Sequence, residues 1–203
     1  MNLRFEEEAK KEHRKKIITE ILRYLVEIII VIGVAWIIVN FTLKKIVVIG
    51  SAMDNTLYNG EEVIVSTFVY NFTSPGRGTV IAFYPEKNVV TSDDISDSNI
   101  IIRRVVGLPG EKVRMNMGKI YINGEEITEN YAFDKNVSSG QAESEIQLDE
   151  DEFFVLSDKR TDLDDSRSSS FTKVKKENII GPVMIALDPL SIVSGPDEPE
   201  KKE

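Results

Sequence analysis

The feature that most constrains this chain is a long apolar run near its N-terminus. The run, YLVEIIIVIGVAWIIVNFTL, covers residues 24–43 and holds one acid, Glu27, near its start and one amide, Asn40, near its end. A helix of this length spans roughly 30 Å, the thickness of a bilayer's hydrocarbon core. Because the run is apolar on every face, we expect a membrane-spanning anchor, preceded by a charged, helix-prone cytoplasmic segment at residues 1–23.

Two other interpretations of this run stay open. A helix buried in a soluble core is also apolar, and a cleaved signal peptide also places an apolar run after a charged segment. The lengths of the run and of the charged segment favour an uncleaved anchor. More basic residues precede the run than follow it, which favours a single-pass protein of the cell membrane with an extracellular C-terminal part. Before the run lie Lys10, Lys11, Arg14, Lys15, Lys16 and Arg23, and after it lie Lys44 and Lys45.

Composition excludes several kinds of chemistry. The 203 residues include no cysteine, so disulfides and thiol nucleophiles are impossible, and the one histidine, His13, precedes the apolar run. A Ser-His-Asp triad after the run is therefore excluded. Residues 46–203 carry 16 basic and 28 acidic side chains, a balance of −12, which argues against binding nucleic acid. We expect no metal and no cofactor.

After the apolar run the pattern is that of β-strands. Short β-branched runs are bounded by Gly, Pro, Asn and Asp, and Asn123-Gly124 separates two alternating runs as in a hairpin. Polar stretches at 91–99 and 134–145 are expected to be loops. We predict a mostly β domain over residues 46–195, followed by a disordered acidic tail at 196–203. The predicted strands are 46–49, 62–68, 78–84, 100–107, 112–117, 119–122, 152–156 and 179–185.

Three motifs follow the apolar run in a fixed order. They are GSAMDNTL at 50–57, RRVVGLPGE at 103–111 and SDKRTDLDDSR at 157–167. With the anchor they resemble bacterial type I signal peptidases, whose motifs read G-x-S-M-x-P-T-L, K-R-x-x-G-L-P-G-D and G-D-N-R-x-x-S-x-D-S-R. The resemblance implies a membrane-anchored serine endopeptidase with a Ser/Lys dyad. It also implies an extracytoplasmic antiparallel β domain with a small appended β region.

The three positions that carry the family's catalysis are altered in this chain. The nucleophilic serine falls on Ala52, the general-base lysine on Arg103, and the serine that orients this lysine on Leu163. A methyl group cannot attack a carbonyl, and arginine keeps its proton because its pKa is about 12.5 or above. Ser51 lies next to Ala52, but adjacent side chains in extended backbone point to opposite faces. Asn55 replaces the motif's proline.

The resemblance assigns two further roles. Gly50, Ser51, Met53 and Arg103 are expected to line a peptide-binding cleft. Asp158, Arg160, Asp165 and Arg167 are expected to form a structural ion-pair network below it. A calcium loop on Asp162, Asp164 and Asp165 is an alternative, although it lacks the spacing of known loops. A relocated active site is another alternative, with Lys112, Lys119 or Lys159 as the base or with Asp54 and Asp158 as a carboxylate pair.

The chain is therefore predicted to be an inactive signal-peptidase-like protein that binds an exported polypeptide. Family members without the dyad occur in pilus gene clusters of Gram-positive bacteria, so the resemblance implies a pilin-like partner, together with a sortase or an active signal peptidase. Membrane lipid would surround residues 24–43. The alternatives are a working peptidase that uses unmatched residues, and a subunit that modulates an active signal peptidase.

Overall fold

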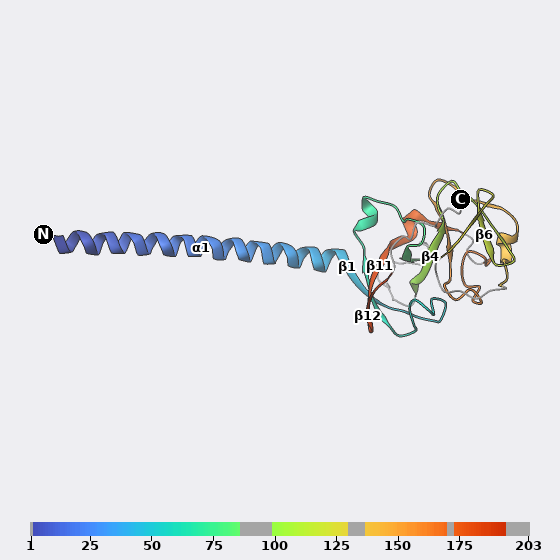
Figure 1. The fold of residues 1–203 in the computed structure, drawn as a ribbon, viewed down its shortest axis with the longest axis horizontal. Coiled ribbons are helices and arrows are strands. Elements are labelled where there is room, and N and C mark those ends of the chain that lie inside the picture. The colour runs from blue at the N-terminus through green and yellow to red at the C-terminus, as the bar shows by residue number, and fades with distance from the viewer. Residues whose placement is uncertain (1, 86–98, 130–136, 170–172, 194–203) are drawn as a thin grey trace. The chain divides into compact units, whose positions relative to one another are not determined.

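The computed structural model describes residues 2–85, 99–129, 137–169 and 173–193, with helix side chains described for 15–36 and for residue 42. The chain divides into two compact units, Met1–Thr42 and Leu43–Glu203. The first unit is one α-helix, α1 (Asn2–Thr42), and the second is built from strands (Figure 1). Within the described residues, no α-helix follows residue 42.

The helix α1 presents apolar side chains in all directions. Ile28, Ile29, Ile30, Val31 and Ile32 are all exposed, and five consecutive residues turn through more than one full turn of a helix. Among the residues whose side chains the structure describes, no helix meets the length and apolarity needed to cross a membrane.

The described residues of the second unit form two antiparallel sheets. The larger has the strand order β1-β2-β11-β3-β4-β9-β10, with β12 also paired to β11, and the smaller has the order β7-β6-β5-β8. The strands of the larger sheet are β1 (Leu43–Val47), β2 (Glu62–Ser66), β3 (Val80–Phe83), β4 (Ile101–Gly107), β9 (Glu152–Leu156), β10 (Val174–Lys175), β11 (Ile179–Leu187) and β12 (Leu190–Ile192). Those of the smaller sheet are β5 (Lys112–Asn116), β6 (Lys119–Ile122), β7 (Glu125–Ile127) and β8 (Ile146–Gln147).

The mostly β, antiparallel fold predicted from the sequence is confirmed. Each of the eight predicted strands corresponds to a strand of the structure, with ends that differ by at most three residues. The hairpin at Asn123-Gly124 is also present, because Ile122 pairs with Glu125 and both turn residues have positive φ. Among the described residues, the 3₁₀ helices η1 (Val69–Asn71), η4 (Gly140–Glu143) and η5 (Lys176–Asn178) lie between strands.

Several expectations need correction. Leu43, predicted as the last residue of the anchor, belongs to β1, and the strands β8, β10 and β12 were not predicted. The strand β7 is the second strand of the predicted hairpin. Ser51 and Ala52 lie in a turn and not in extended backbone. The tail at 196–203 and the loop at 91–99, except for its last residue, fall outside the described residues.

Three groups of buried side chains hold the second unit together. The first joins β1, β2, β3 and β11 and includes Ile46, Val48 and Met53; the second lies under the smaller sheet; the third joins β3, β4, β9 and β10. The first group reaches Ile100 and Ile102 at the start of β4. The segment after β1 and the start of β4 are thereby brought to the same region, although they are about 50 residues apart in the sequence.

Candidate functional site

A small pocket, part of which is open to solvent, brings together two of the three altered motif positions. Ala52 from the first motif and Arg103 from the second both line it. Gly50 and Met53, also predicted for the cleft, line it too. The remaining lining residues are apolar: Val48, Ile49, Ile100 and Ile102. The other two predicted residues, Ser51 and Leu163, are exposed and are not among the lining residues.

The turn that carries Ala52 has an unusual backbone conformation. Gly50 has a φ of +92° and Asn55 a φ of +88°. The first motif normally has proline at the position of Asn55. Proline is restricted to a φ near −65° and cannot adopt a positive φ. Asn is among the few residues that tolerate positive φ. The change from proline to Asn55 therefore accompanies a different turn and is not a neutral exchange.

Arg103 is held by groups of the chain itself. Its Nε and Nη2 donate to the backbone oxygen and the carboxylate of Asp164, at 2.7 and 2.8 Å, and its Nη1 donates to the Ile102 carbonyl at 2.6 Å. Burial lowers the pKa of Arg103 below its ordinary value, while Asp164 and three further aspartates act in the opposite direction. The side chain nevertheless stays a cation, because arginine is not deprotonated in proteins.

A buried network joins residues of all three motifs. Arg104 donates to both carboxylate oxygens of Asp158, at 2.8 and 2.6 Å, and both side chains are almost fully buried. The Thr56 hydroxyl donates to Asp158 and accepts from Arg104. The backbone N–H of Lys159 donates to the Ala52 carbonyl at 3.0 Å. Ala52 is therefore held in place by the third motif.

The other members of the predicted network form a second buried group. Arg167 donates to both carboxylate oxygens of Asp165, which also accepts the backbone N–H of Ser157. Arg160 pairs with Glu129 at 2.8 Å, and both are buried. The sequence gives no signal for Glu129, because it lies outside the motifs. Asp164 and Asp165 are both engaged by arginines, so the calcium-loop alternative loses two of its three carboxylates.

The lysines considered as relocated bases lie in ion pairs. Lys159 pairs with Asp54 at 2.9 Å. Lys112 and Lys119, both in the smaller sheet, pair with glutamates. Asp158 is bound by Arg104, so it is not paired with Asp54 as a carboxylate dyad.

Two strand edges border the pocket, and among the described residues neither edge has a neighbouring strand at this point. The backbone N–H of Val48 donates to the Glu61 carbonyl, and the Val48 carbonyl accepts from the N–H of Gly60. Because successive residues of a strand direct their backbone groups to opposite sides, those of Ile49 face away from the 60–61 segment. The backbone of Val105 forms hydrogen bonds with Gly78 and Thr79, on the side of β4 that faces β3. Backbone groups alternate in direction along a strand, so the N–H and C=O of Ile102, three residues earlier, face away from β3. The described pairing of β4 with β9 begins at Arg104, so Ile102 lies outside the paired part of β4. The Ile102 carbonyl nevertheless already accepts a hydrogen bond from the Arg103 side chain.

The family model for "Signal peptidase, peptidase S26" matches residues 21–187. The match covers most of the chain, including all three motifs and both edges of the pocket. The chain belongs to the bacterial type I signal peptidase family.

Curated relatives of this signal peptidase family agree. The chain is 26% identical over 187 residues to "Signal peptidase I P" of Bacillus subtilis subsp. natto, covering 89% of this chain and 95% of the relative. It is 28% identical over 140 residues to "Probable signal peptidase I-2" of Synechocystis, covering 69% of this chain. The match spans 61% of the Synechocystis protein, less than two thirds of its length. A crystal structure of a signal peptidase I from Enterococcus faecalis is 29% identical, with a TM-score of 0.41, and covers 55% of this chain and 98% of that one.

Proposed function

We propose that this chain is a membrane-anchored, non-catalytic member of the signal peptidase family that binds an exported polypeptide in the pocket beside Ala52. The observation that carries the proposal is the meeting of Ala52 and Arg103 in one pocket. These residues occupy the family positions of the nucleophile and the general base. Neither a methyl group nor a permanent cation can perform those roles.

The expected loss of activity is large. In another serine protease, removal of the nucleophile or the base costs roughly a million-fold in turnover. Here both positions are altered, and Leu163, at the position of the orienting serine, is exposed and does not line the pocket.

Peptide binding needs none of these catalytic side chains. An extended peptide binds to an open strand edge through backbone hydrogen bonds, and neighbouring pockets select its side chains. Among the described residues no strand pairs with the edge at Ile49, and the small pocket beside it is lined by apolar residues together with Arg103. We therefore expect an extended polypeptide with a small, uncharged side chain at the pocket. An anionic group is disfavoured because Arg103 is already paired with Asp164.

The proposal places α1 in a membrane. Its exposed apolar side chains face all directions, which is costly in water and favourable in lipid. The excess of basic residues before the apolar run favours a cytoplasmic N-terminus, with the β domain on the other side.

Binding is tested with the full chain in lipid nanodiscs and a fluorescently labelled peptide that copies a signal-peptide cleavage region. We expect saturable binding by fluorescence anisotropy, with the peptide intact by mass spectrometry after long incubation. Ala52→Leu fills the pocket and is expected to weaken binding at least about tenfold, the effect of 1.4 kcal/mol. Met117→Leu, on the exposed β5–β6 turn, is the matched control and should bind like the unchanged chain.

Two results contradict the proposal. Cleavage of the peptide favours the second candidate, a working peptidase with unmatched residues, which family membership alone supports. Absence of binding to every exported precursor tested, with normal thermal unfolding, removes the binding role. Co-purification with an active signal peptidase favours a modulating subunit. Capture of a pilin supports the narrower proposal of a role in pilus assembly.

A further inference from the structure

The two strand edges beside the pocket are not equally able to pair with a peptide. Ile49 and Ile102 both line the pocket, one just after β1 and the other within β4. At the second edge, the Ile102 carbonyl accepts a hydrogen bond of 2.6 Å from Nη1 of Arg103. The acceptor that this edge would offer to a peptide N–H is therefore already engaged by a side chain of the same strand.

The guanidinium of Arg103 is fixed in this position from two further sides. Its Nε donates to the Asp164 carbonyl at 2.7 Å and its Nη2 to the Asp164 carboxylate at 2.8 Å, and the side chain is only 6% exposed. A hydrogen bond donated by a cation is roughly twice as strong as one between neutral groups. A peptide N–H is a neutral donor, so we expect it not to displace the guanidinium from the Ile102 carbonyl.

Arginine is suited to this arrangement in a way that the family's lysine is not. Its planar guanidinium presents N–H donors on three nitrogens, whereas lysine ends in a single ammonium nitrogen. Arg103 uses all three nitrogens, two towards Asp164 and one back to the residue that precedes it in β4. The change at this position therefore alters the binding edge as well as the chemistry.

Backbone alternation shows which part of a bound peptide this affects. An extended segment directs the backbone groups of successive residues to opposite sides. When one of its residues pairs with Ile49, the residues on either side direct their N–H groups away from that edge. The backbone groups of Ile102 face away from β3 and lie outside the paired part of β4, so the Ile102 carbonyl is the acceptor on that side of the pocket.

We propose that Arg103 makes the pocket selective for a polypeptide that pairs along the Ile49 edge alone. The inference rests on the proposed function and gives Arg103 a specificity-determining role in it. The residue of the bound segment that faces Ile102 needs no backbone N–H, so proline, which lacks this group, is accepted there. At the position that pairs with Ile49 the N–H is needed, and proline is rejected.

Amide-to-ester substitution tests this directly, because it replaces one backbone N–H by oxygen and leaves the side chain in place. Each residue of the labelled cleavage-region peptide is replaced in turn by the matching 2-hydroxy acid. Affinity for the full chain in lipid nanodiscs is measured by fluorescence anisotropy. We expect a loss of about five- to tenfold at the position that pairs with Ile49, the effect of one hydrogen bond, and of less than about twofold at both adjacent positions.

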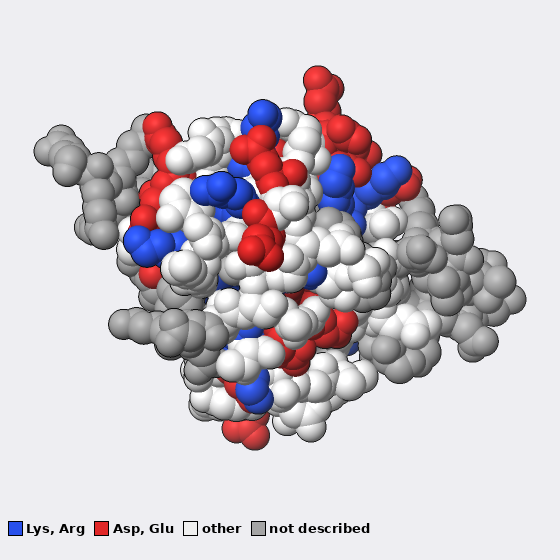
Figure 2. Space-filling model, turned by 90° about the vertical axis from the view of Figure 1, so that its right-hand side faces the viewer, with Lys and Arg blue, Asp and Glu red and all other residues white. Residues whose placement is uncertain are grey.

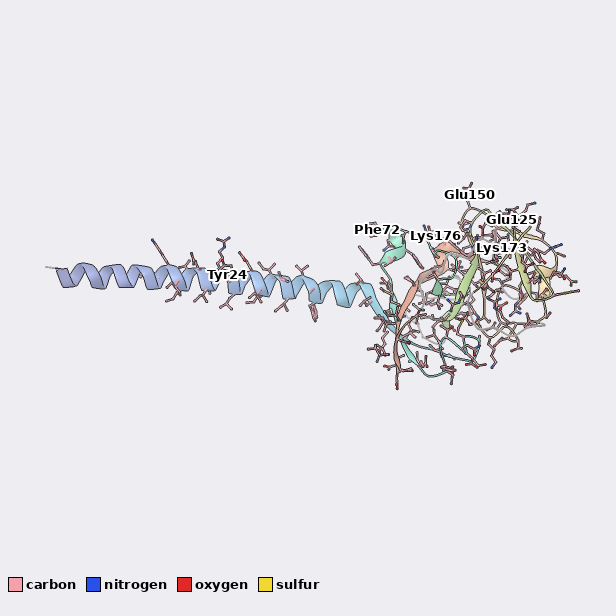
Figure 3. The ribbon with its side chains drawn as sticks, viewed as in Figure 1. Tyr24, Phe72, Glu125, Glu150, Lys173 and Lys176 are labelled. Carbon is pink, nitrogen blue, oxygen red and sulfur yellow. The ribbon has the colours of Figure 1, made fainter. Side chains whose placement is uncertain are left out.

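Arg103→Met removes the donors and frees the Ile102 carbonyl, so one adjacent position should then also lose about five- to tenfold. Arg114→Met is the matched control and should keep the pattern of the unchanged chain. Arg114 is exposed on β5, where it stacks over Tyr121. Figure 2 shows basic and acidic side chains interspersed at the end of the domain that holds the smaller sheet, and Figure 3 shows Glu125 of this sheet at the surface.

The outcomes separate this inference from the proposed function. Sensitivity at an adjacent position in the unchanged chain overturns the inference and leaves peptide binding in place. An unaltered pattern in a cooperatively folded Arg103→Met variant does the same. If this variant does not fold, the ester series in the unchanged chain decides alone. A chain that binds none of the peptides removes the proposed function, and the specificity with it.

Discussion

Arg103 and Arg104 are neighbours in β4, but their guanidinium groups lie in different electrostatic surroundings. Asp158, the partner of Arg104, has no exposed surface, whereas the side chain of Asp164, the partner of Arg103, is 60% exposed. Loss of a cation costs most when it leaves a buried carboxylate without compensation, because that charge cannot be solvated.

Arg104→Met should therefore destabilise the β domain by about 3–5 kcal/mol, the usual cost of breaking a buried ion pair. Arg103→Met should cost only about 1–2 kcal/mol, since water can solvate Asp164. The two variants form a matched pair, measured by chemical unfolding of the full chain. Equal losses would contradict the assignment of Arg104 to the central network.

Restoring the nucleophile alone should not restore catalysis. Ala52→Ser supplies a hydroxyl at the pocket, but Arg103, the one ionisable side chain among the described residues that line the pocket, stays protonated and cannot take its proton. We expect no cleavage of a signal-peptide substrate above background by mass spectrometry. An enzyme active in this single variant would mean that another base serves the pocket.

At the scale of elements, β2 and β11 approach each other very closely at Gly181. A Cβ atom on Gly181 would lie 1.7 Å from the Ser66 carbonyl oxygen, which is backbone and cannot rotate away. Gly181→Ala should force these strands apart and destabilise the domain by more than about 3 kcal/mol. Ser191→Ala, on the exposed strand β12, is the control, and thermal unfolding by circular dichroism compares them. A variant with unchanged melting temperature would show that β11 shifts freely.

The start of β9 has a pH-dependent contact. Burial alone would raise the pKa of Glu152, but hydrogen bonds from Lys173 and from the Asp149 backbone outweigh it, so this pKa is lowered from 4.5. A carboxyl group whose pKa is lowered by folding stabilises the fold at pH values above its ordinary pKa. This contribution is lost as the pH falls through the lowered pKa of the folded state. Glu152→Gln should cost about 1 kcal/mol at neutral pH, or roughly 2–4 °C in melting temperature.

The difference between Glu152→Gln and the unchanged chain should shrink as the pH falls through the lowered pKa, because the unchanged side chain then becomes protonated as well. Glu150→Gln, at an exposed neighbouring position, is the control and should have little effect on stability. A constant difference across this range would mean that the charge of Glu152 does not stabilise β9.

Strands with strong local signals were predictable, and short ones were not. The 119–122 and 152–156 strands have the predicted ends because β-branched or aromatic runs meet turn residues there. β8 and β10 contain two residues each, and their pairing depends on partners distant in sequence. The motifs predicted that Ala52 and Arg103 would meet. They carried no information on Glu129 or Asp164 as partners, because such pairings depend on three-dimensional proximity.

At the scale of the whole molecule, the two units should be separable. All three buried groups lie between Ile46 and Val193, within the second unit. A chain beginning at Leu43 should therefore unfold cooperatively, with a melting temperature within about 2 °C of that of the full chain. A shift of this size corresponds to a change of less than about 1 kcal/mol in the free energy of unfolding. A broad, non-cooperative transition would show that α1 contributes to the core of the β domain.

The network of Thr56, Arg104 and Asp158 has a consequence for how members of this family are recognised. Its three residues come from three motifs and bond to one another, so each is required by the scaffold even when no peptide bond is broken. The reacting atoms of the family occupy other positions, which the scaffold tolerates with a methyl group and a guanidinium. Motif matches therefore report inherited architecture, while chemical competence has to be judged from the few atoms that would exchange a proton.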